Sequence, residues 1–298
     1  MEVNSTNTTN RQRIFYLSAD GFKRDKDFVR SPLRYPGGKY YALKYIMPFL
    51  NCVPHDEYRE PFLGGGNVFF AKKKSPINWL NDLESDLIEL YKVIADSELR
   101  SQLINMVSTE TASRERHEEI KNMVPNSTLE IAFRTYYLNR TSYSGIINKP
   151  AWGYAEGKSS PPQNWPKLLE PAGKKLSNVK ITCKDFEEVI TAKPEGNTVL
   201  MYLDPPYYHA DQKRAYTKPF SIEDHLRLAK LLKETNYLFC LSYDDCPEIR
   251  QLYSWAEIYE LSWLYNTANI KGQSRKLGRE LIITNYKVIQ EELTLFDF

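Results

Sequence analysis

The chain has 298 residues, a formal net charge of +2 and an apolar fraction of 42%. This length suits one large domain, or a domain that carries a smaller inserted module, with enough apolar residues for a packed core. The longest apolar runs fall far short of the roughly 20 residues that a membrane helix needs, and the polar N-terminus lacks a secretory signal. We therefore expect a cytoplasmic globular protein without a membrane span.

The cysteines and histidines are scattered along the chain. No two cysteines form a C-x-x-C pair, and no histidine stands beside them at the spacing of metal ligands. Disulfides and a structural zinc site are therefore both disfavoured. We expect no metal, and reduced thiols at Cys52, Cys183, Cys240 and Cys246.

Short apolar stretches alternate with segments patterned as helices. Residues 1–28 are expected to be a flexible segment, and strands are predicted at 57–62, 77–80, 179–182, 199–203, 237–242 and 281–284. Strands that alternate with helices are typical of an α/β fold with a largely parallel sheet.

One predicted helix has a clear beginning. Residues 221–224 have the form of a capping box, and Leu226, Ala229 and Leu232 then share one helical face. We expect that face to pack on the sheet.

The segment 108–177 breaks the alternation. It combines Arg, Asn and Ser with many aromatic residues and a Pro-rich stretch. We interpret it as an insertion, so that residues 29–107 and 178–298 together form the α/β domain. Its aromatic side chains either contact a ligand or form a small core of their own, and for Tyr136 and Leu138 we expect the core.

Polar or glycine-rich segments follow four of the predicted strands, at the edge where open α/β sheets bind ligands. They are the glycine turn 64–66, Asp82, Asp185 with Phe186, and Asp204. The glycine turn lacks the Gly-Lys-Ser/Thr of a phosphate loop, and Phe69 replaces the last glycine of the dinucleotide pattern. A nucleoside ligand without a phosphate tail fits these features better.

The most specific segment is Asp204-Pro205-Pro206-Tyr207. An exocyclic amine on a purine is a poor nucleophile, because its lone pair is delocalised into the ring. The Asp204 carboxylate and the Pro205 carbonyl would accept hydrogen bonds from such an amine and stabilise the positive charge that grows as it attacks a methyl sulfonium. Tyr207 would stack on the base, which must leave the duplex to be reached. The alternative is a rigid turn with Asp204 as a cap.

Four motifs in this order resemble the Dam-like group of DNA adenine-N6 methyltransferases of the alpha type. They are residues 31–39 with a lysine, the glycine turn 60–67, the segment 137–145, and the tetrapeptide 204–207. The resemblance covers residues 30–286. It implies a class I S-adenosylmethionine-dependent fold, Rossmann-like with a largely parallel sheet, and a mostly helical target-recognition insert at 108–177.

The resemblance also implies roles for single residues. The catalytic set is Asp204, Pro205, Pro206 and Tyr207, and the contacts to the donor S-adenosyl-L-methionine are Tyr35, Lys39, Phe62, Gly64, Asp82, Asp185, Phe186 and Asp204. Asp82 would bind the ribose, Lys39 would lie near the donor's carboxylate, and Asp185 with Phe186 would face its adenine. Alternatives remain open: a solvated Lys39, Asp82 as a helix cap, and both phenylalanines in the core.

The recognition insert and a basic C-terminal loop are the expected DNA contacts. The residues are Arg134, Asn139, Arg140, Tyr143, Asn148, Lys271 and Arg275. The loop that carries the last two is alternatively an exposed hairpin tip. We expect duplex DNA as the substrate and a monomeric enzyme, which either works alone or has a restriction endonuclease as its functional partner. The competing hypotheses are an enzyme for cytosine, RNA adenine or glutamine side chains, and a non-catalytic DNA-binding module.

Overall fold

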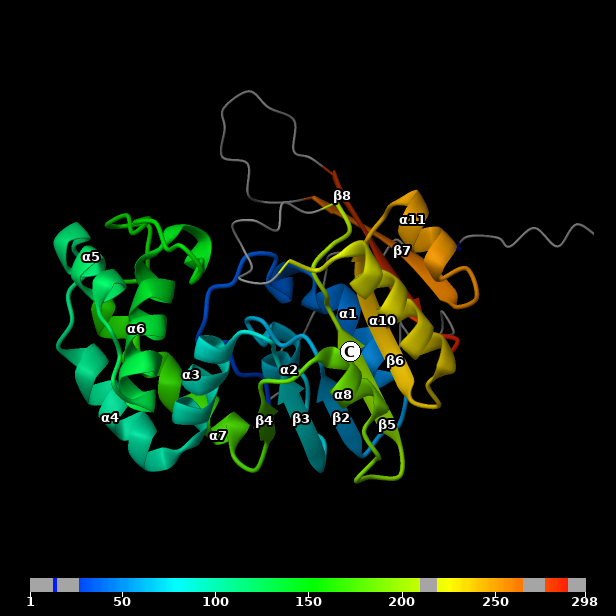
Figure 1. The fold of residues 1–298 in the computed structure, drawn as a ribbon, viewed down its shortest axis with the longest axis horizontal. Coiled ribbons are helices and arrows are strands. Elements are labelled where there is room, and N and C mark those ends of the chain that lie inside the picture. The colour runs from blue at the N-terminus through cyan, green and yellow to red at the C-terminus, as the bar shows by residue number, and fades with distance from the viewer. Residues whose placement is uncertain (1–12, 15–26, 210–218, 265–276, 289–298) are drawn as a thin grey trace, which may run out of the picture.

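A computed structural model describes residues 13–14, 27–209, 219–264 and 277–288. Its eight strands form one sheet in the order β1-β7-β8-β6-β5-β2-β3-β4 (Figure 1). The strands are β1 Arg13–Ile14, β2 Glu57–Glu60, β3 Ile77–Asn81, β4 Lys180–Thr182, β5 Val199–Leu203, β6 Leu238–Asp244, β7 Glu257–Leu264 and β8 Leu277–Thr284. Strand β8 runs antiparallel to β6 and β7, and every other pairing described is parallel.

The strand order reverses between β2 and β5. Strand β2 pairs with β3 on one side and with β5 on the other, and both pairings are parallel. A chain that leaves the centre of a sheet in two directions opens a crevice beyond the strand ends, and ligands bind there in open α/β sheets. This rule puts the expected crevice between the glycine turn after β2 and the tetrapeptide after β5.

Helices cover both faces of the sheet. They are α1 Leu43–Asn51, α2 Asn67–Ala71, α3 Ser85–Ala95, α8 Phe186–Thr191, α10 Ile222–Glu234 and α11 Pro247–Leu252. Along β5, Leu200 and Tyr202 pack with α1, α2 and α3, whereas Met201 and Leu203 pack with α8, α10 and α11. Every residue of β5 is therefore buried, and the continuous apolar run of this strand follows from having helices on both faces.

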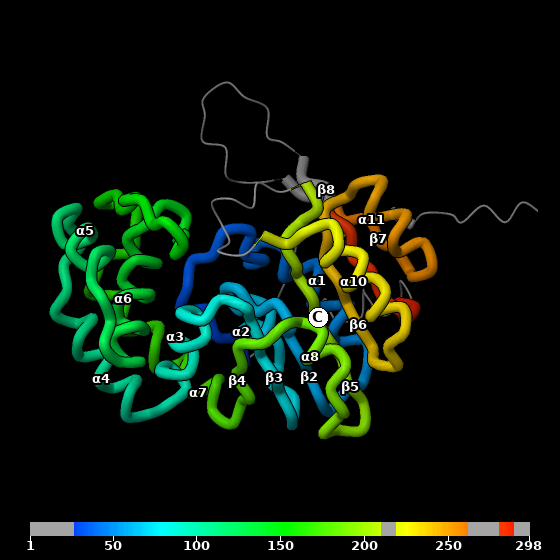
Figure 2. Tube along the Cα trace, viewed as in Figure 1, coloured from blue at the N-terminus to red at the C-terminus, as the bar shows by residue number. Residues whose placement is uncertain are grey.

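A helical lobe, residues 97–176, extends from one end of the sheet beyond β4 (Figures 1 and 2). It consists of α4 Ser97–Ser108, α5 Arg114–Asn122, α6 Thr128–Thr141, α7 Leu169–Leu176 and short 3-10 turns. The lobe packs on α3, and its buried aromatic side chains Tyr136, Tyr137 and Trp165 join the same core as the sheet. The helical packing begins at α4, upstream of residue 108, because α4 packs on α6 and α7.

The structure confirms the six predicted strands, with ends shifted by up to four residues at β8, and the capping box of α10 at Ser221 and Asp224. The prediction for Leu226 was wrong: this side chain is 51% exposed, and Leu228 is buried in its place. Strand β7 was not predicted. Its partner β1, an edge strand of the sheet, lies within the N-terminal segment that was expected to be flexible. Arg13 and Ile14 pair there with Tyr259 and Glu260 of β7.

The core prediction for Tyr136 and Leu138 is confirmed, since both side chains are fully buried. All four cysteines are free thiols. In the part of the chain that the structure describes, no helix has the length and apolar character needed to cross a bilayer.

Candidate active site

The N-terminal lysine motif and the tetrapeptide after β5 meet through a pair of charges. The Lys39 ammonium donates to both carboxylate oxygens of Asp204, at 2.6 and 2.8 Å, and to the carbonyl of Gly37 at 3.3 Å. The same ammonium lies 4.8 Å from the centre of the Tyr207 ring. Two motifs far apart in the sequence thus form one site at the crevice between β2 and β5.

Charges around the pair fix its protonation. Burial raises the pKa of Asp204, and the ammonium of Lys39 opposes that rise. Burial lowers the pKa of Lys39, but the charges of Asp204 and Glu280 outweigh this effect and its pKa is raised. The raised pKa favours the cationic form of Lys39, and this charge stabilises the ionised form of Asp204.

Two further carboxyl groups near this pair were not among the predicted site residues. Glu280 is buried in β8, and its charge acts on both Lys39 and Tyr207. Glu60, at the end of β2, is fully enclosed and accepts a hydrogen bond of 2.5 Å from the Tyr58 hydroxyl. Burial raises the pKa of Glu60 to about 8, and the charge of Asp204 adds to the rise. The available signal was a glutamate within a strand: Glu60 is the last residue of β2, and Glu280 directly precedes the apolar run 281–283 of β8.

The glycine turn is shaped by its contact with Tyr35. Gly64 has a φ of +48°, and a Cβ on Gly65 would lie 2.7 Å from the Cβ of Tyr35. A side chain at either position would strain the backbone or displace Tyr35. The turn is thus closed on one side by an aromatic ring from the lysine motif.

Asp82 holds the glycine turn against the end of β3. Its two carboxylate oxygens accept hydrogen bonds from the backbone N–H groups of Gly64, at 2.7 Å, and Glu84, at 3.0 Å. The alternative role as the cap of the following helix is not what the structure shows, since α3 begins at Ser85 with Glu84 in the capping position. An ionised carboxylate accepts about four hydrogen bonds, so Asp82 retains acceptor capacity for ligand hydroxyl groups.

Phe62 and Phe186 lie side by side across the strand ends, with ring centres 5.4 Å apart, and Phe220 packs against both. Asp185 caps α8 through the N–H of Glu187 and forms a two-point ion pair with Arg227. The Arg227 guanidinium lies 4.2 Å from the centre of the Phe186 ring. Phe220 and Arg227 were not predicted, because helix α10 and its approach contribute them from a distant part of the sequence.

The predicted DNA contacts differ in exposure. Tyr143 is 69% exposed on a turn in which Ser144 has a φ of +53°, and Asn148 is half-buried. Arg134 donates to the Lys121 carbonyl at 3.1 Å and lies 3.7 Å from Asp86. The remaining described pair, Asn139 and Arg140, is buried. Lys271 and Arg275 lie outside the described residues.

Asn139 joins the helical lobe to the lysine motif. Its amide accepts from the N–H of Arg34 at 3.0 Å and donates to the carbonyls of Arg34, at 2.6 Å, and Gly145, at 2.9 Å. Arg140 packs its guanidinium 6.0 Å from the centre of the Trp165 ring, and its carbonyl accepts from Arg34. In this structure the end of α6 positions the segment that carries Lys39, and Tyr143 follows at the surface.

A family model covers most of the chain. Residues 35–267 match the D12 class N6 adenine-specific DNA methyltransferases, and this region includes Lys39, the glycine turn and the tetrapeptide. The chain belongs to this family. The chain is therefore a DNA adenine-N6 methyltransferase with a class I fold, and its methyl donor is S-adenosyl-L-methionine.

Two curated relatives align along nearly their whole length. The type II methyltransferase M1.LlaDCHI of Lactococcus lactis subsp. cremoris is 29% identical over 89% of this chain and 98% of its own. The type II methyltransferase M.MjaIII of Methanocaldococcus jannaschii is 28% identical over 87% and 99%, respectively. Among solved structures, the rRNA methyltransferase AviRa from Streptomyces viridochromogenes is 13% identical, with a TM-score of 0.35 over 84% of this chain and 85% of that one. The family assignment does not depend on this weak overlap.

The residues at the crevice suit the donor's chemistry. Its ribose hydroxyls need an acceptor such as Asp82, and its adenine needs a flat apolar face such as that of the half-buried Phe62. Phe186, which packs against Phe62, is only 5% exposed and belongs to the core, as the alternative interpretation of this residue expected. The glycine turn presents backbone without side chains between Asp82 and Phe62. These residues therefore fit a nucleoside without phosphates.

Proposed function

We propose that the methyltransferase turns its target adenine out of duplex DNA and holds the exocyclic amine at Asp204. The observation that carries this proposal is the Lys39–Asp204 pair at the carboxyl end of β5, with the Tyr207 ring beside the ammonium. The bound donor supplies the electrophilic methyl group. The protein contributes acceptors and a stacking surface.

Asp204 accepts a hydrogen bond from one N–H of the amine, and the Pro205 carbonyl accepts from the other. Both acceptors favour a more tetrahedral nitrogen and stabilise the charge that grows on it. Lys39 uses only part of the acceptor capacity of Asp204, since each carboxylate oxygen takes about two hydrogen bonds. Pro206 restricts the backbone between the Pro205 carbonyl and Tyr207. The Tyr207 ring stacks on the base.

The donor pocket in this proposal lies on the β2 and β3 side of the crevice. Tyr35 and Gly64 form its wall, Asp82 binds the ribose, and Phe62, packed on Phe186, contacts the adenine ring. Asp185 acts through Arg227, which it fixes over Phe186. We retain Lys39 as a donor contact, with its main role the support of Asp204.

The DNA surface is proposed to run from Tyr143 and Asn148 across the helical lobe. A shallow cleft of about 540 Å³ between α5 and the chain before Trp152 is lined by Arg114, Lys121 and Lys149, and by Glu118, which lies 3.1 Å from the Lys121 ammonium. Three cations against one carboxylate leave this cleft with a net positive charge, which suits a phosphate backbone. A second cleft, of about 390 Å³, has Glu110 and Glu156 in its lining and is unsuited to phosphates.

The remaining predicted contacts divide into two groups. Arg134 and Arg140 would reach DNA only if they gave up the contacts that they make in this structure. Asn139 and Arg140 are buried, and we assign both first to positioning the recognition segment. Lys271 and Arg275 are retained as phosphate contacts on the basis of the sequence.

We further propose that residues 29–107 and 178–298 act as the catalytic domain and 108–177 as the recognition insert. Because the insert gives the protein its own asymmetry, a monomer suffices to read a short duplex site. Relatives named as type II methyltransferases suggest a restriction endonuclease as functional partner. The enzyme then acts where its DNA substrate lies, in the cytoplasm of a bacterial or archaeal cell.

The decisive experiment transfers labelled methyl groups from S-adenosyl-L-methionine to genomic DNA and maps them by modification-sensitive sequencing. N6-methyladenine at one short motif supports site-specific action on duplex DNA. Comparison of a fully paired duplex with one that has the target adenine mispaired then tests extrusion, since a mispaired base costs less to turn out. Equal rates on both, with chemistry limiting, would contradict an extrusion cost.

A further inference from the structure

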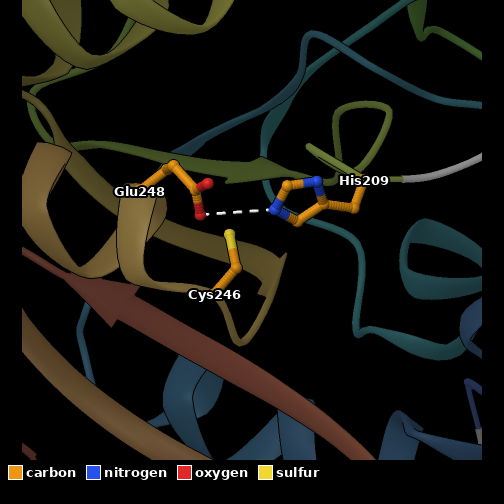
Figure 3. Close-up of side chains that lie close together, drawn as sticks. All are labelled: His209, Cys246 and Glu248. Atoms are coloured by element: carbon orange, nitrogen blue, oxygen red, sulfur yellow. Dashed lines mark hydrogen bonds and ion pairs between the residues drawn. The ribbon is translucent and has the colours of Figure 1, made fainter.

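Three potential metal ligands converge next to the tetrapeptide, although the sequence places His209 far from the other two. Nitrogen of His209, sulfur of Cys246 and a carboxylate oxygen of Glu248 all lie within 4.8 Å of one another. Figure 3 shows the three side chains pointing toward a common space. His209 Nε2 lies 3.3 Å from a carboxylate oxygen of Glu248.

The backbone on both sides of this space is held in place. The Asp244 carboxylate accepts from the N–H groups of Tyr208, at 3.0 Å, and His209, at 3.4 Å. Cys246 is the residue before α11, its side chain makes no capping hydrogen bond, and Pro247 begins the helix. The backbone that carries His209 and Cys246 is thus anchored before any ion binds, and a ready-made backbone lowers the cost of such a site.

The ligand set has the chemistry of a zinc-class cation. Imidazole, thiolate and carboxylate bind zinc at about 2.0–2.3 Å in a tetrahedral arrangement, which places nitrogen and oxygen ligands roughly 3.4 Å apart. The 3.3 Å between His209 and Glu248 already matches that separation. Magnesium prefers oxygen ligands in octahedral geometry and does not suit a thiolate.

We propose that His209, Cys246 and Glu248 bind one zinc-class divalent cation, with water as the fourth ligand. On binding, the Cys246 thiol loses its proton to solvent, and the ion forms bonds to sulfur, nitrogen and oxygen without a change of oxidation state. The bound ion ties the turn after Tyr207 to the start of α11. It thereby holds the tetrapeptide's last residue against β6 and α11, a structural role that is independent of how the base is bound.

Cobalt is the probe, because a Cys-bound Co²⁺ ion gives a thiolate-to-metal charge-transfer band. Full-length protein stripped with a chelator is titrated with Co²⁺ and then with Zn²⁺. The expected result is one equivalent of Co²⁺ with the band, displaced by Zn²⁺ and not by Mg²⁺. Zn²⁺ is also expected to raise the Tm of the protein.

Variants assign the site. Cys246→Ser is expected to abolish the band. Glu248→Gln and His209→Ala are expected to weaken Zn²⁺ binding by roughly tenfold or more, because the loss of a metal ligand lowers affinity at least as much as the loss of a residue that supports a ligand. The matched control is Cys183→Ser, which removes an exposed thiol elsewhere and leaves band and Tm shift unchanged. His209 and Glu248 are 60% and 42% exposed, so their variants fold even if Cys246→Ser does not.

Two outcomes overturn the proposal. The first is no band and no Tm shift at up to a tenfold excess of metal over protein. The second is stoichiometric binding that persists in both Cys246→Ser and His209→Ala, which would place the ion at another site.

Discussion

The Lys39 ammonium lies between both carboxylate oxygens of Asp204, at 2.6 and 2.8 Å, and the face of the Tyr207 ring, at 4.8 Å from its centre. This cation opposes the effect of burial on Asp204, which would otherwise favour the protonated acid. A protonated Asp204 presents a donor where the adenine amine needs an acceptor. In the proposed mechanism, the lysine motif therefore controls the charge of Asp204 on which methyl transfer depends.

Lys39→Gln is expected to shift the pH dependence of methyl transfer. Without the ammonium, burial alone acts on Asp204 and its pKa rises further. Activity needs the ionised acid, so it is lost as the pH falls through this pKa, and the acidic limb of the kcat/KM profile moves to higher pH. At neutral pH we expect a loss of roughly 10²-fold.

The control for this shift is Lys73→Gln, which removes an exposed lysine outside the site. It should leave the profile unchanged. A Lys39→Gln enzyme with a lower rate but an unmoved acidic limb would mean that Lys39 does not set the charge of Asp204.

Asp204→Ala is expected to abolish transfer, with a fall in kcat of roughly 10³-fold or more, because the acceptor for the amine is lost. Donor binding should be weaker but still measurable by calorimetry, since Asp82 and the glycine turn remain. Tyr207→Ala should mainly impair binding of the base. Turnover like that of the unmodified enzyme in Asp204→Ala would remove the basis for the catalytic assignment.

Tyr143→Ala is expected to slow methylation of fully paired DNA and to recover on a duplex with the target adenine mispaired. The ring is 69% exposed on the turn after α6, and a wedge matters only while a paired base must be turned out. Unfolding stability should change by less than about 0.5 kcal/mol, as for an exposed position. Asp204→Ala, in contrast, should not recover on the mispaired duplex.

Asn139→Ala is expected to act on stability instead. The change leaves the N–H and carbonyl of Arg34 and the carbonyl of Gly145 without their present partner. Each buried unpaired group costs about 1–3 kcal/mol, so the Tm should fall clearly in thermal unfolding. An unchanged Tm with altered sequence preference would show that Asn139 reads DNA as the sequence first indicated.

Glu60 should make the protein less stable as the pH rises. Its pKa is about 8 in the folded protein against a normal value of 4.5, so the folded state binds more protons between these values. Unfolding free energy therefore falls from about pH 4.5 to about pH 8. Glu60→Gln keeps an acceptor for Tyr58 and removes the titration, so its stability curve should be flatter over that range.

Denaturant unfolding at several pH values measures this effect. Glu98→Gln, at an exposed position, is the matched control and should follow the unmodified protein. Parallel curves for the unmodified protein and Glu60→Gln would mean that Glu60 is ionised over the whole range.

The sequence by itself determined the α/β class, six of the strands and the order of the motifs. Apolar strands such as Val199–Leu203 and the capping box at Ser221 are local features, and local periodicity and turn chemistry decide them. Strand β7 was not predicted, although polar and apolar residues alternate along part of it. Its pairing with β1 joins segments more than 200 residues apart, which no local pattern indicates.

Only the tertiary structure decided which side chains meet. Asn139 reads as a polar residue of a recognition segment, yet packing of α6 against Arg34 buries it. Glu280, Phe220 and Arg227 enter the site from strands and helices whose placement no local pattern encodes. His209 and Cys246 show no ligand spacing, because the sheet brings together the ends of β5 and β6 across the length of α10. Contacts between distant segments follow from the global packing, and residue spacing alone does not contain them.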